Sequence, residues 1–321
     1  MANFYTIIPR LGNKTASWKH IHDVLKEKAK KYYCEPFIGS GFVFLKMKKL
    51  FPQMYSMVGD MDNELGNYWW QSLTNTDEIC KFLGSAPSSE GLFNYLKKLI
   101  PKNDMERAVR FWYLARLSGP SGDRGQSIFK CRKDGYSHDS IKHASVQTGI
   151  GGLVKNNKQG SNGLSKVAAV NVGGIIKQNK IHNRKDGGNH LSSVPTGYFD
   201  DFQSIMQLLK HRTSFLVEDY ERLIQRADDL WGIDKYLLYC DPPYVGTEGY
   251  YGCEFDHERL FKILDGRDFV LNYNDCMEIR RKYKDYKMKS YEIRGRKELL
   301  IWKECANEYP IHKEVKQRKL W

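Results

Sequence analysis

Asp241 begins a segment, Asp-Pro-Pro-Tyr, whose groups suit chemistry on the exocyclic amine of a nucleobase. Such an amine is a poor nucleophile because its lone pair is delocalised into the ring, and acceptors for its N–H bonds turn that lone pair towards an electrophile. Asp241 supplies one acceptor and the carbonyl of Pro242 a second, since proline keeps its C=O although it lacks an N–H. Tyr244 offers a ring for stacking, worth about 1–3 kcal/mol per base. The alternative is an ordinary turn, because Asp-Pro and Pro-Pro are common turn dipeptides.

The residues before this segment, 235–239, are apolar and aromatic, as in a buried strand. Pro242 and Pro243 end that strand, because neither can donate a ladder hydrogen bond and both fix φ. The sequence therefore predicts a stiff turn at the carboxyl end of a strand, where open α/β sheets bind their ligands.

A second candidate ligand site lies between a predicted strand at 31–34 and a following helix. Gly39 and Gly41 permit a tight turn and a close approach of the backbone to a ligand, and the free N–H groups of the helix point back at that turn. This order is typical of a nucleoside-cofactor site. Phe44 replaces the last small residue of the full dinucleotide fingerprint, so the glycine spacing alone is a weak signal.

Asp60 follows a second predicted strand, at 54–58, and lies about 20 residues after Gly41, where an acidic residue is placed to bind ribose hydroxyls. The alternative role for Asp60 is the N-cap of the helix that begins near Asn63. Both roles can hold, because Asp62 is an equally good cap.

Hydrophobic periodicity predicts the other elements. Ser17 is a candidate cap for a first helix. Met105 begins an amphipathic helix whose apolar face is Ala108, Phe111, Trp112 and Ala115. Helices are also expected at 198–209, 219–230 and 256–264, and strands at 214–217 and 269–273.

The chain has 321 residues and a strong basic excess, with 51 Lys and Arg against 38 Asp and Glu and a pI near 9.2. This field favours nucleic acid or another anionic surface; a merely soluble basic protein is the alternative. No run of about 18 apolar residues predicts a membrane span, and the first residues do not have the pattern of a signal peptide. The seven scattered cysteines form no Cys-x-x-Cys. We therefore expect reduced thiols, a cytoplasmic location and no metal.

Segments 35–41, 59–65 and 241–244 resemble, in this order, motifs of the Dam family (D12 class) of DNA adenine N6-methyltransferases. Residues 9–14 are similar to the N-terminal motif of that family, although the usual tryptophan is missing and Asn13 replaces a glycine. Segment 110–116 is similar to the family's central helix, and segment 215–220 is similar to the strand before the catalytic one. Segments 269–275 and 296–301 are similar to its closing strands. The likeness covers both ends of the chain and is poor from about 119 to 194.

The resemblance implies an α/β fold: a Rossmann-like methyltransferase sheet that depends on S-adenosylmethionine, with an inserted, mainly helical target-recognition domain and basic glycine-rich loops. It implies a catalytic domain at 1–65 and 196–321. The recognition domain is then 66–195, with a loop-rich insertion at about 119–195.

The resemblance also implies roles for single residues. The segment that holds a flipped adenine is Asp241, Pro242, Pro243 and Tyr244. The residues that bind S-adenosylmethionine are Arg10, Lys14, Phe37, Gly39, Ser40, Gly41, Asp60, Asp219 and Asp241.

The interval from Cys131 to Val194 has ten Lys or Arg against three Asp, together with ten glycines. Basic loops fit this composition best, and a disordered linker is the alternative. We expect DNA contacts from Arg116, Arg124, Lys155, Lys158, Arg184 and Lys185.

The sequence thus predicts a site-specific enzyme that transfers a methyl group from S-adenosylmethionine to N6 of a flipped adenine in double-stranded DNA. We expect a monomer or weak dimer in the cytoplasm of a prokaryotic or phage-infected cell, without metal or membrane. The alternatives are methylation of RNA adenine or of cytosine N4, and a non-catalytic DNA-binding relative. Asp241 argues against cytosine N4 and against RNA as targets. Families that methylate cytosine N4 typically begin the motif with serine, and families that methylate RNA typically begin it with asparagine.

Overall fold

The computed structural model describes residues 14–86, 90–117, 198–247, 254–293 and 295–304. The chain divides into two compact units. The sheet unit contains the described parts of 14–66 and 208–304, and the helical unit contains those of 67–117 and 198–207.

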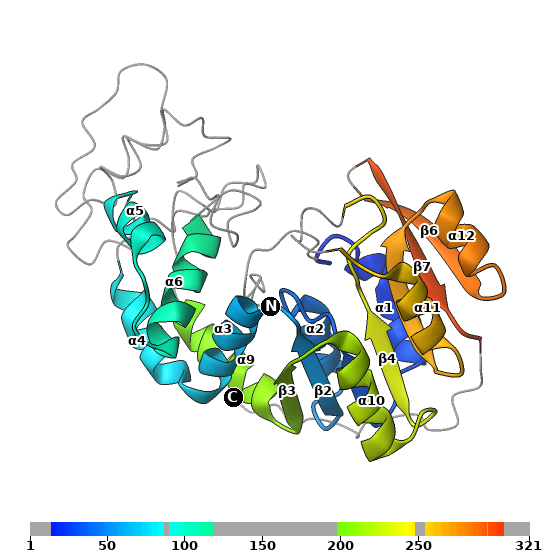
Figure 1. Ribbon diagram of the computed structural model, residues 1–321. Coiled ribbons are helices and arrows are strands. Elements are labelled where there is room, and N and C mark those ends of the chain that lie inside the picture. Colours follow the sequence, from blue (N-terminus) through cyan, green and yellow to red (C-terminus); the bar gives the residue numbers. More distant parts are fainter. Residues whose placement is uncertain (1–13, 87–89, 118–197, 248–253, 294, 305–321) are drawn as a thin grey trace, which may run out of the picture. The chain divides into compact units, whose positions relative to one another are not determined.

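The described strands of the sheet unit form one seven-stranded sheet in the order β3-β2-β1-β4-β5-β7-β6 (Figure 1). β3, β2, β1, β4 and β5 run parallel, β7 is antiparallel to β5, and β6 is antiparallel to β7. The strands are β1 (Tyr32–Glu35), β2 (Tyr55–Asp60), β3 (Thr213–Val217), β4 (Tyr236–Cys240), β5 (Phe269–Asn274), β6 (Lys287–Ile293) and β7 (Arg296–Trp302). The chain progresses outwards in opposite directions from β1 and β4, so these two strands flank the switch point where open α/β sheets bind ligands.

The central strands are buried because helices cover them. Every residue of β4 is buried, as the apolar run at 235–239 predicts. Tyr33 and Cys34, which are neighbours in β1, face opposite sides of the sheet, since side chains alternate along a strand. Cys34 belongs to the core beneath α10 (Tyr220–Trp231), α11 (His257–Leu264) and α12 (Met277–Lys282), whereas Tyr33 stacks at 6.4 Å on Phe44 of α2 (Phe42–Leu50).

The helices predicted from Met105 and at 198–209, 219–230 and 256–264 are present to within a residue, whereas α12 was not predicted. Ser17 stands at the N-cap position of α1 (Trp18–Glu27), but its side chain makes no capping hydrogen bond, and its hydroxyl donates to Glu298 at 3.1 Å instead. The cap prediction for Ser17 is therefore wrong in its chemistry, because a partner from a distant strand takes the hydroxyl.

The helical unit contains α4 (Thr76–Ser85), α5 (Glu90–Lys98) and α6 (Asp104–Leu117), with parts of α3 (Asn63–Thr74) and α9 (Tyr198–Lys210). The predicted apolar face of α6, Ala108, Phe111, Trp112 and Ala115, is buried. Arg110 of α6 donates to the carbonyls of Leu96 and Lys97 at 2.8 and 3.2 Å, which satisfies the last turn of α5. None of the helices in the described ranges combines the length and apolar composition that a membrane span requires.

Candidate active site

The two turns that the sequence singles out lie side by side at the switch point. β1 pairs with β4 in parallel, with Tyr32 opposite Tyr236, so the carboxyl ends of both strands reach the same edge of the sheet. The glycine turn follows β1 and the Asp-Pro-Pro-Tyr turn follows β4. The structure therefore brings the two candidate ligand sites together, although about 200 residues separate them in the chain.

Backbone conformation explains the glycines of the first turn. Gly39 and Gly41 have φ of 48° and 68°, in the left-handed region that favours glycine. The N–H of Gly41 donates to the carbonyl of Ile38 at 2.7 Å, and the N–H of Ile38 donates to the carbonyl of Gly59 at 2.9 Å. These bonds close the turn and attach it to β2, and α2 begins directly after it.

The carboxylate of Asp60 is directed at this turn. Its Oδ2 accepts the N–H of Gly39 at 3.1 Å and its Oδ1 accepts the N–H of Asp62 at 3.1 Å. Asp62 caps α3 by accepting the N–H groups of Glu64 and Leu65 at 3.0 and 3.2 Å. The cap role therefore falls on Asp62, while Asp60 lies beside the glycine turn and its contact with a ribose stays a prediction.

Asp241 forms an ion pair with Lys14, whose Nζ lies 2.9 Å from Oδ2. Lys14 is only 4% exposed, and its ammonium lies 5.1 Å from the ring centroid of Tyr244. Burial raises the pKa of the Asp241 carboxyl to about 6. Lys14 and a hydrogen bond from the Tyr244 hydroxyl oppose that rise, because both favour the ionised carboxylate.

A buried polar network lies behind Tyr244. Asn272 of β5 donates through Nδ2 to the Tyr244 hydroxyl, and also to Oε2 of Glu298 at 3.1 Å. The Tyr291 hydroxyl of β6 lies 2.5 Å from Asn272 Oδ1 and 2.7 Å from Glu298 Oε2. Burial opposes the charge of Glu298, but the Lys14 ammonium and the donated hydrogen bonds hold the pKa of that carboxyl below its ordinary value.

Glu35, at the end of β1, is a second buried acid near Asp241. The Tyr33 hydroxyl donates to its Oε2 at 2.6 Å. Burial raises the pKa of the Glu35 carboxyl well above its ordinary range, and the charge of Asp241 acts in the same direction. The site therefore holds its acids in different environments, with Asp241 paired to a lysine and Glu35 bonded to a phenol.

Phe37 belongs to an aromatic cluster at the same edge of the sheet. Its ring lies 5.2 Å from that of Tyr220 and 5.8 Å from that of Phe255. Ser40, in the glycine turn, is buried. These rings offer an apolar surface next to the turn, of the kind that lines small-molecule sites.

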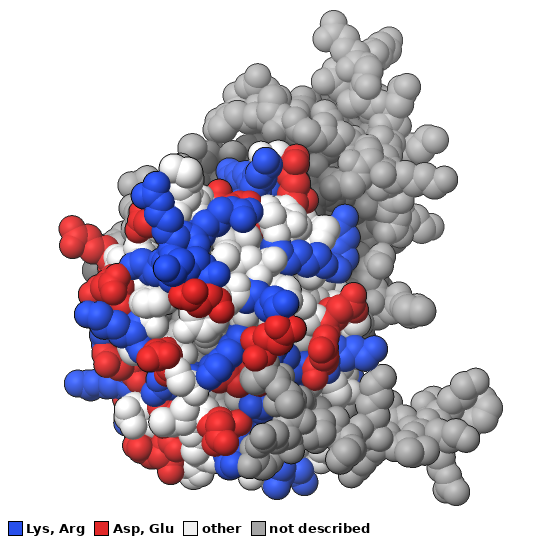
Figure 2. All heavy atoms as spheres, turned by 90° about the vertical axis from the view of Figure 1, so that its right-hand side faces the viewer, with Lys and Arg blue, Asp and Glu red and all other residues white. Residues whose placement is uncertain are grey.

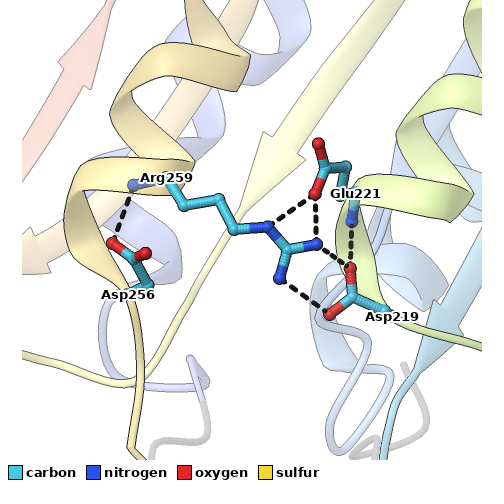
Figure 3. A network of polar contacts seen from close by, with 4 residues as sticks. All are labelled: Asp219, Glu221, Asp256 and Arg259. Carbon is cyan, nitrogen blue, oxygen red and sulfur yellow. Dashed lines mark hydrogen bonds and ion pairs between the residues drawn. The ribbon is translucent and has the colours of Figure 1, made fainter.

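Asp219 is engaged by other protein groups (Figure 3). It caps α10 by accepting the N–H of Glu221 at 3.0 Å, and its carboxylate pairs with Arg259 of α11 at 2.7 Å. The Arg259 guanidinium also bonds to the Glu221 carboxylate and lies 4.9 Å from the ring centroid of Tyr220. The predicted contact of Asp219 with a cofactor stays a prediction, and its described contacts join α10 to α11.

Several predicted site residues lie outside the described residues. For Arg116 the structure describes the backbone in α6 but not the side chain. The others are Arg10, Arg124, Lys155, Lys158, Arg184 and Lys185.

Sequence reasoning missed Glu35, Asn272, Tyr291 and Glu298 as members of the site. A signal was present for Asn272, a polar residue inside the apolar run of β5. A buried amide is costly unless it is hydrogen-bonded, so its presence in a central strand indicates partners. Nothing in the local pattern named Tyr291 and Glu298 as those partners, because they come from other strands.

No group of three or more His, Cys, Asp or Glu side chains within the described ranges could hold a metal ion. The mixed α/β sheet, with a glycine turn and an Asp-Pro-Pro-Tyr turn at its switch point, is consistent with the methyltransferase class. Residues 11–119 match the family model described as D12 class N6 adenine-specific DNA methyltransferase. A search of curated proteins finds no match.

This match, over about a third of the chain, agrees with the family that the motifs predict. The reaction that this description names is methylation of adenine N6 in DNA. The matched residues include Lys14, the glycine turn and Asp60, whereas the Asp-Pro-Pro-Tyr segment lies beyond them.

Proposed function

We propose that the methyl donor is S-adenosylmethionine and that the acceptor is an adenine flipped out of double-stranded DNA. The observation that carries this proposal is the parallel pairing of β1 with β4, because it sets the glycine turn beside Asp241. When bound, S-adenosylmethionine supplies a methyl group on a sulfonium, which is a strong electrophile.

The residues of the glycine turn fit such a donor. Among the described residues, apart from the two neighbours of Gly39 in the chain, no heavy atom lies within 4 Å of the position that a Cβ on Gly39 would take, which leaves room for close approach of a ligand. Asp60 keeps acceptor capacity for ribose hydroxyls, since a carboxylate can accept about four hydrogen bonds. The cluster of Phe37, Tyr220 and Phe255 would hold an apolar part of the donor, with Arg10, Lys14, Ser40, Gly41 and Asp219 as further proposed contacts.

The Asp-Pro-Pro-Tyr turn would hold the target amine. Asp241, with a pKa of about 6, is mostly ionised at neutral pH and accepts one N–H bond while the carbonyl of Pro242 accepts the other. Pro243 stiffens the turn, and the Tyr244 ring stacks on the base and helps to stabilise its growing positive charge. Flipping costs a few kcal/mol. Asp241 needs only to orient the amine and stabilise that charge, because methylated N6 becomes acidic enough to lose a proton readily.

The helical unit and residues 119–195 would supply target recognition. The support is the concentration of positive charge between 131 and 194, since neutralisation of phosphates dominates affinity for DNA. We place the enzyme in the cytoplasm of a bacterium or a phage-infected cell, as a monomer or weak dimer.

The test is to incubate plasmid DNA that lacks N6-methyladenine with the enzyme and labelled S-adenosylmethionine, and to map methylated bases by sequencing. We expect N6-methyladenine at one short sequence. Label in N4-methylcytosine, or label only when RNA is supplied, would contradict the proposal. The same assay without label transfer would favour a DNA-binding relative that has lost turnover.

Two variants separate the proposed roles. Asp241→Ala should reduce turnover by at least about 10²–10³-fold while the Kd for S-adenosylmethionine changes little. Asp60→Ala should raise that Kd by about 10–100-fold, as expected for a lost hydrogen bond to a charged group. Asp62→Ala is the matched control, because it removes a helix cap and should cost about 1 kcal/mol of stability without this change in Kd. Wild-type turnover in both Asp241→Ala and Asp60→Ala would show that the site lies elsewhere.

A further inference from the structure

Asn272 is a fully buried amide in β5, inside the buried run Phe269–Tyr273. Its neighbours along β5, Leu271 and Tyr273, are also fully buried. A leucine of similar size would fill this position without the cost of burying an amide. Packing alone therefore does not explain why an asparagine occupies this position.

The network fixes which way this amide points. Oδ1 of Asn272 receives the Tyr291 hydroxyl at 2.5 Å, and Nδ2 donates to Oε2 of Glu298 at 3.1 Å. A flipped amide would set its oxygen against the Glu298 carboxylate, and two acceptors repel each other. The second N–H of Nδ2 is consequently directed at the Tyr244 hydroxyl, to which Asn272 is also bonded.

The Tyr244 hydroxyl has a single proton and accepts from Asn272, so that proton is free to be donated elsewhere. The Tyr244 ring and the Asp241 carboxylate both lie next to the Lys14 ammonium, at 5.1 Å from the ring centroid and 2.9 Å from Oδ2. As a hydrogen-bond donor, the Tyr244 hydroxyl lowers the pKa of Asp241, whose ionised carboxylate accepts only. Asp241 is thus held by two donors, the Tyr244 hydroxyl and the Lys14 ammonium at 2.9 Å. Its remaining lone pairs are the ones available to a target amine.

We infer that Asn272 is a positioning residue for methyl transfer: it orients the Tyr244 hydroxyl so that this hydroxyl donates to Asp241 and fixes the carboxylate that accepts the amine. Tyr291 and Glu298 hold Asn272 in the required orientation. The inference rests on the proposed function of Asp241 and extends the site to strands β5, β6 and β7.

The acidity of Asp241 provides a readout that packing alone would not change. The groups that act on this carboxyl come from several elements: Lys14 from the segment before α1, Glu35 from β1, Tyr239 from β4, Tyr244 from the turn, Tyr291 from β6 and Glu298 from β7. Of these, Lys14 and Tyr244 donate to the ionised form. Loss of the Tyr244 bond must therefore raise the pKa of Asp241 and move the acidic limb of the rate profile to higher pH.

The experiment compares Asn272→Leu, Tyr244→Phe and the double variant with wild type. Each single variant should lower kcat by about tenfold and leave the KM for DNA within about twofold. The kcat of the double variant should be no lower than that of the slower single variant, because both substitutions break the same chain of hydrogen bonds to Asp241. All three should shift the acidic limb of kcat to higher pH.

Asn274→Leu is the matched control. Asn274 lies two residues further along β5 and also donates to the turn, to the carbonyl of Val245 at 3.1 Å, but it does not bond the Tyr244 hydroxyl. The acidic limb of kcat in the Asn274→Leu variant should stay at the wild-type pH. Two results would overturn the inference. One is a loss of kcat in the double variant that equals the sum of the two single losses in free energy, and the other is an acidic limb of kcat that stays at the wild-type pH in Asn272→Leu. If Asn272→Leu does not fold, Tyr244→Phe with Tyr291→Phe makes the same test, because each removes one link of the network.

A second measurement separates this inference from the proposed function. ¹³C-labelled aspartate in the protein without cofactor or DNA reports the titration of Asp241, which is assigned by the signal lost in Asp241→Asn. The pKa of Asp241 should rise by the same amount in Asn272→Leu and Tyr244→Phe. A protein that shows this rise but methylates no DNA would contradict the proposed function alone. A methylating protein without the rise would contradict the role of Asn272 alone.

Discussion

Asp241 meets two opposing demands at the residue scale. In its proposed role it is ionised and accepts an N–H bond from the amine, yet it lies where burial raises its pKa to about 6. Lys14 reconciles the two, because a buried ammonium 2.9 Å away favours the charged carboxylate. The lysine therefore has an electrostatic role that needs no direct contact with the substrate.

The pH dependence of turnover should follow from this pair. The ionised form of Asp241 predominates above its pKa, so kcat/KM for DNA at saturating donor should fall as the pH drops through about 6. Lys14→Met removes the charge that lowers this pKa, so the inflection should move above 6. Lys19→Met, at an exposed position of α1, is the control and should keep the wild-type inflection. An inflection near the ordinary value of about 4 in wild type would contradict the raised pKa of Asp241.

At the element scale, the sheet separates the site from a second buried ionic group. Asp268, just before β5, pairs with Lys28 at 2.9 Å and with Lys30 at 2.8 Å. All three side chains are buried, and Asp268 precedes β5 whereas the site lies at the carboxyl ends of β1 and β4. This group ties the connection between α1 and β1 to the start of β5.

Asp268→Asn should destabilise the fold by about 3–5 kcal/mol, because it removes the negative charge with which two buried ammonium groups pair. Chemical denaturation measures the loss, and turnover well below the unfolding temperature should be unchanged. Asp265→Asn, in the exposed turn before Asp268, should change stability by less than about 0.5 kcal/mol. Equal effects of the two substitutions would contradict the buried pairing.

Close packing around β2 explains Gly59, which precedes Asp60. A Cβ there would lie 2.2 Å from the carbonyl oxygen of Leu216 on β3 and 2.5 Å from the side chain of Leu223 on α10. Backbone atoms cannot yield as the end of a flexible side chain can. The glycine therefore lets β3 and α10 pack directly against the strand that carries Asp60.

Gly59→Ala should accordingly lower stability by about 1–3 kcal/mol and also weaken donor binding, since Asp60 follows directly. Gly91→Ala in α5 is the contrasting variant, because a Cβ there would meet no atom of the described residues within 4 Å, its neighbours in the chain aside. It should stabilise by about 0.5–1 kcal/mol through helix propensity. Thermal unfolding of both proteins checks the opposite signs, and a stabilised Gly59→Ala protein would refute the contact.

At the scale of the whole molecule, the positive charge is unevenly distributed along the chain. Figure 2 shows Lys and Arg side chains interspersed with Asp and Glu on the described face nearest α12, β6 and β7. The concentrated basic interval in the sequence, 131–194, lies outside the described residues. Affinity for DNA is therefore expected to depend on that interval more than on this face.

Joint replacement of Lys155, Lys158, Arg184 and Lys185 by alanine should weaken binding to all DNA sequences similarly. The slope of log affinity against log salt should become shallower by about 3–4, at about 0.9 per lost phosphate contact. The matched control replaces four exposed lysines of the sheet unit, Lys262, Lys284, Lys287 and Lys289, and should change the slope by less than about 1. Fluorescence anisotropy at several salt concentrations measures the slope for both variants. Equal slopes in the two variants would favour a linker role for the interval.

Much of the fold was predictable from local patterns. The apolar run at 235–239 and the periodicity of α6 report burial directly, because side chains in strands and helices repeat every 2 and 3.6 residues. Two glycines before a helix and two prolines after a strand indicate turns by their backbone limits alone. Ser17 shows the limit of such reasoning, since its hydroxyl bonds to Glu298, which is 281 positions away.

The sequence by itself determined the local chemistry: which residues can accept an amine, which can turn tightly beside a ligand, and in what order these motifs follow one another. Only the tertiary structure decided that Lys14 pairs with Asp241 and that Asn272, Tyr291 and Glu298 stand behind Tyr244. The physical reason is that these contacts depend on the order of strands in the sheet. Strand order arises from the packing of the whole unit, and no short stretch of sequence encodes it.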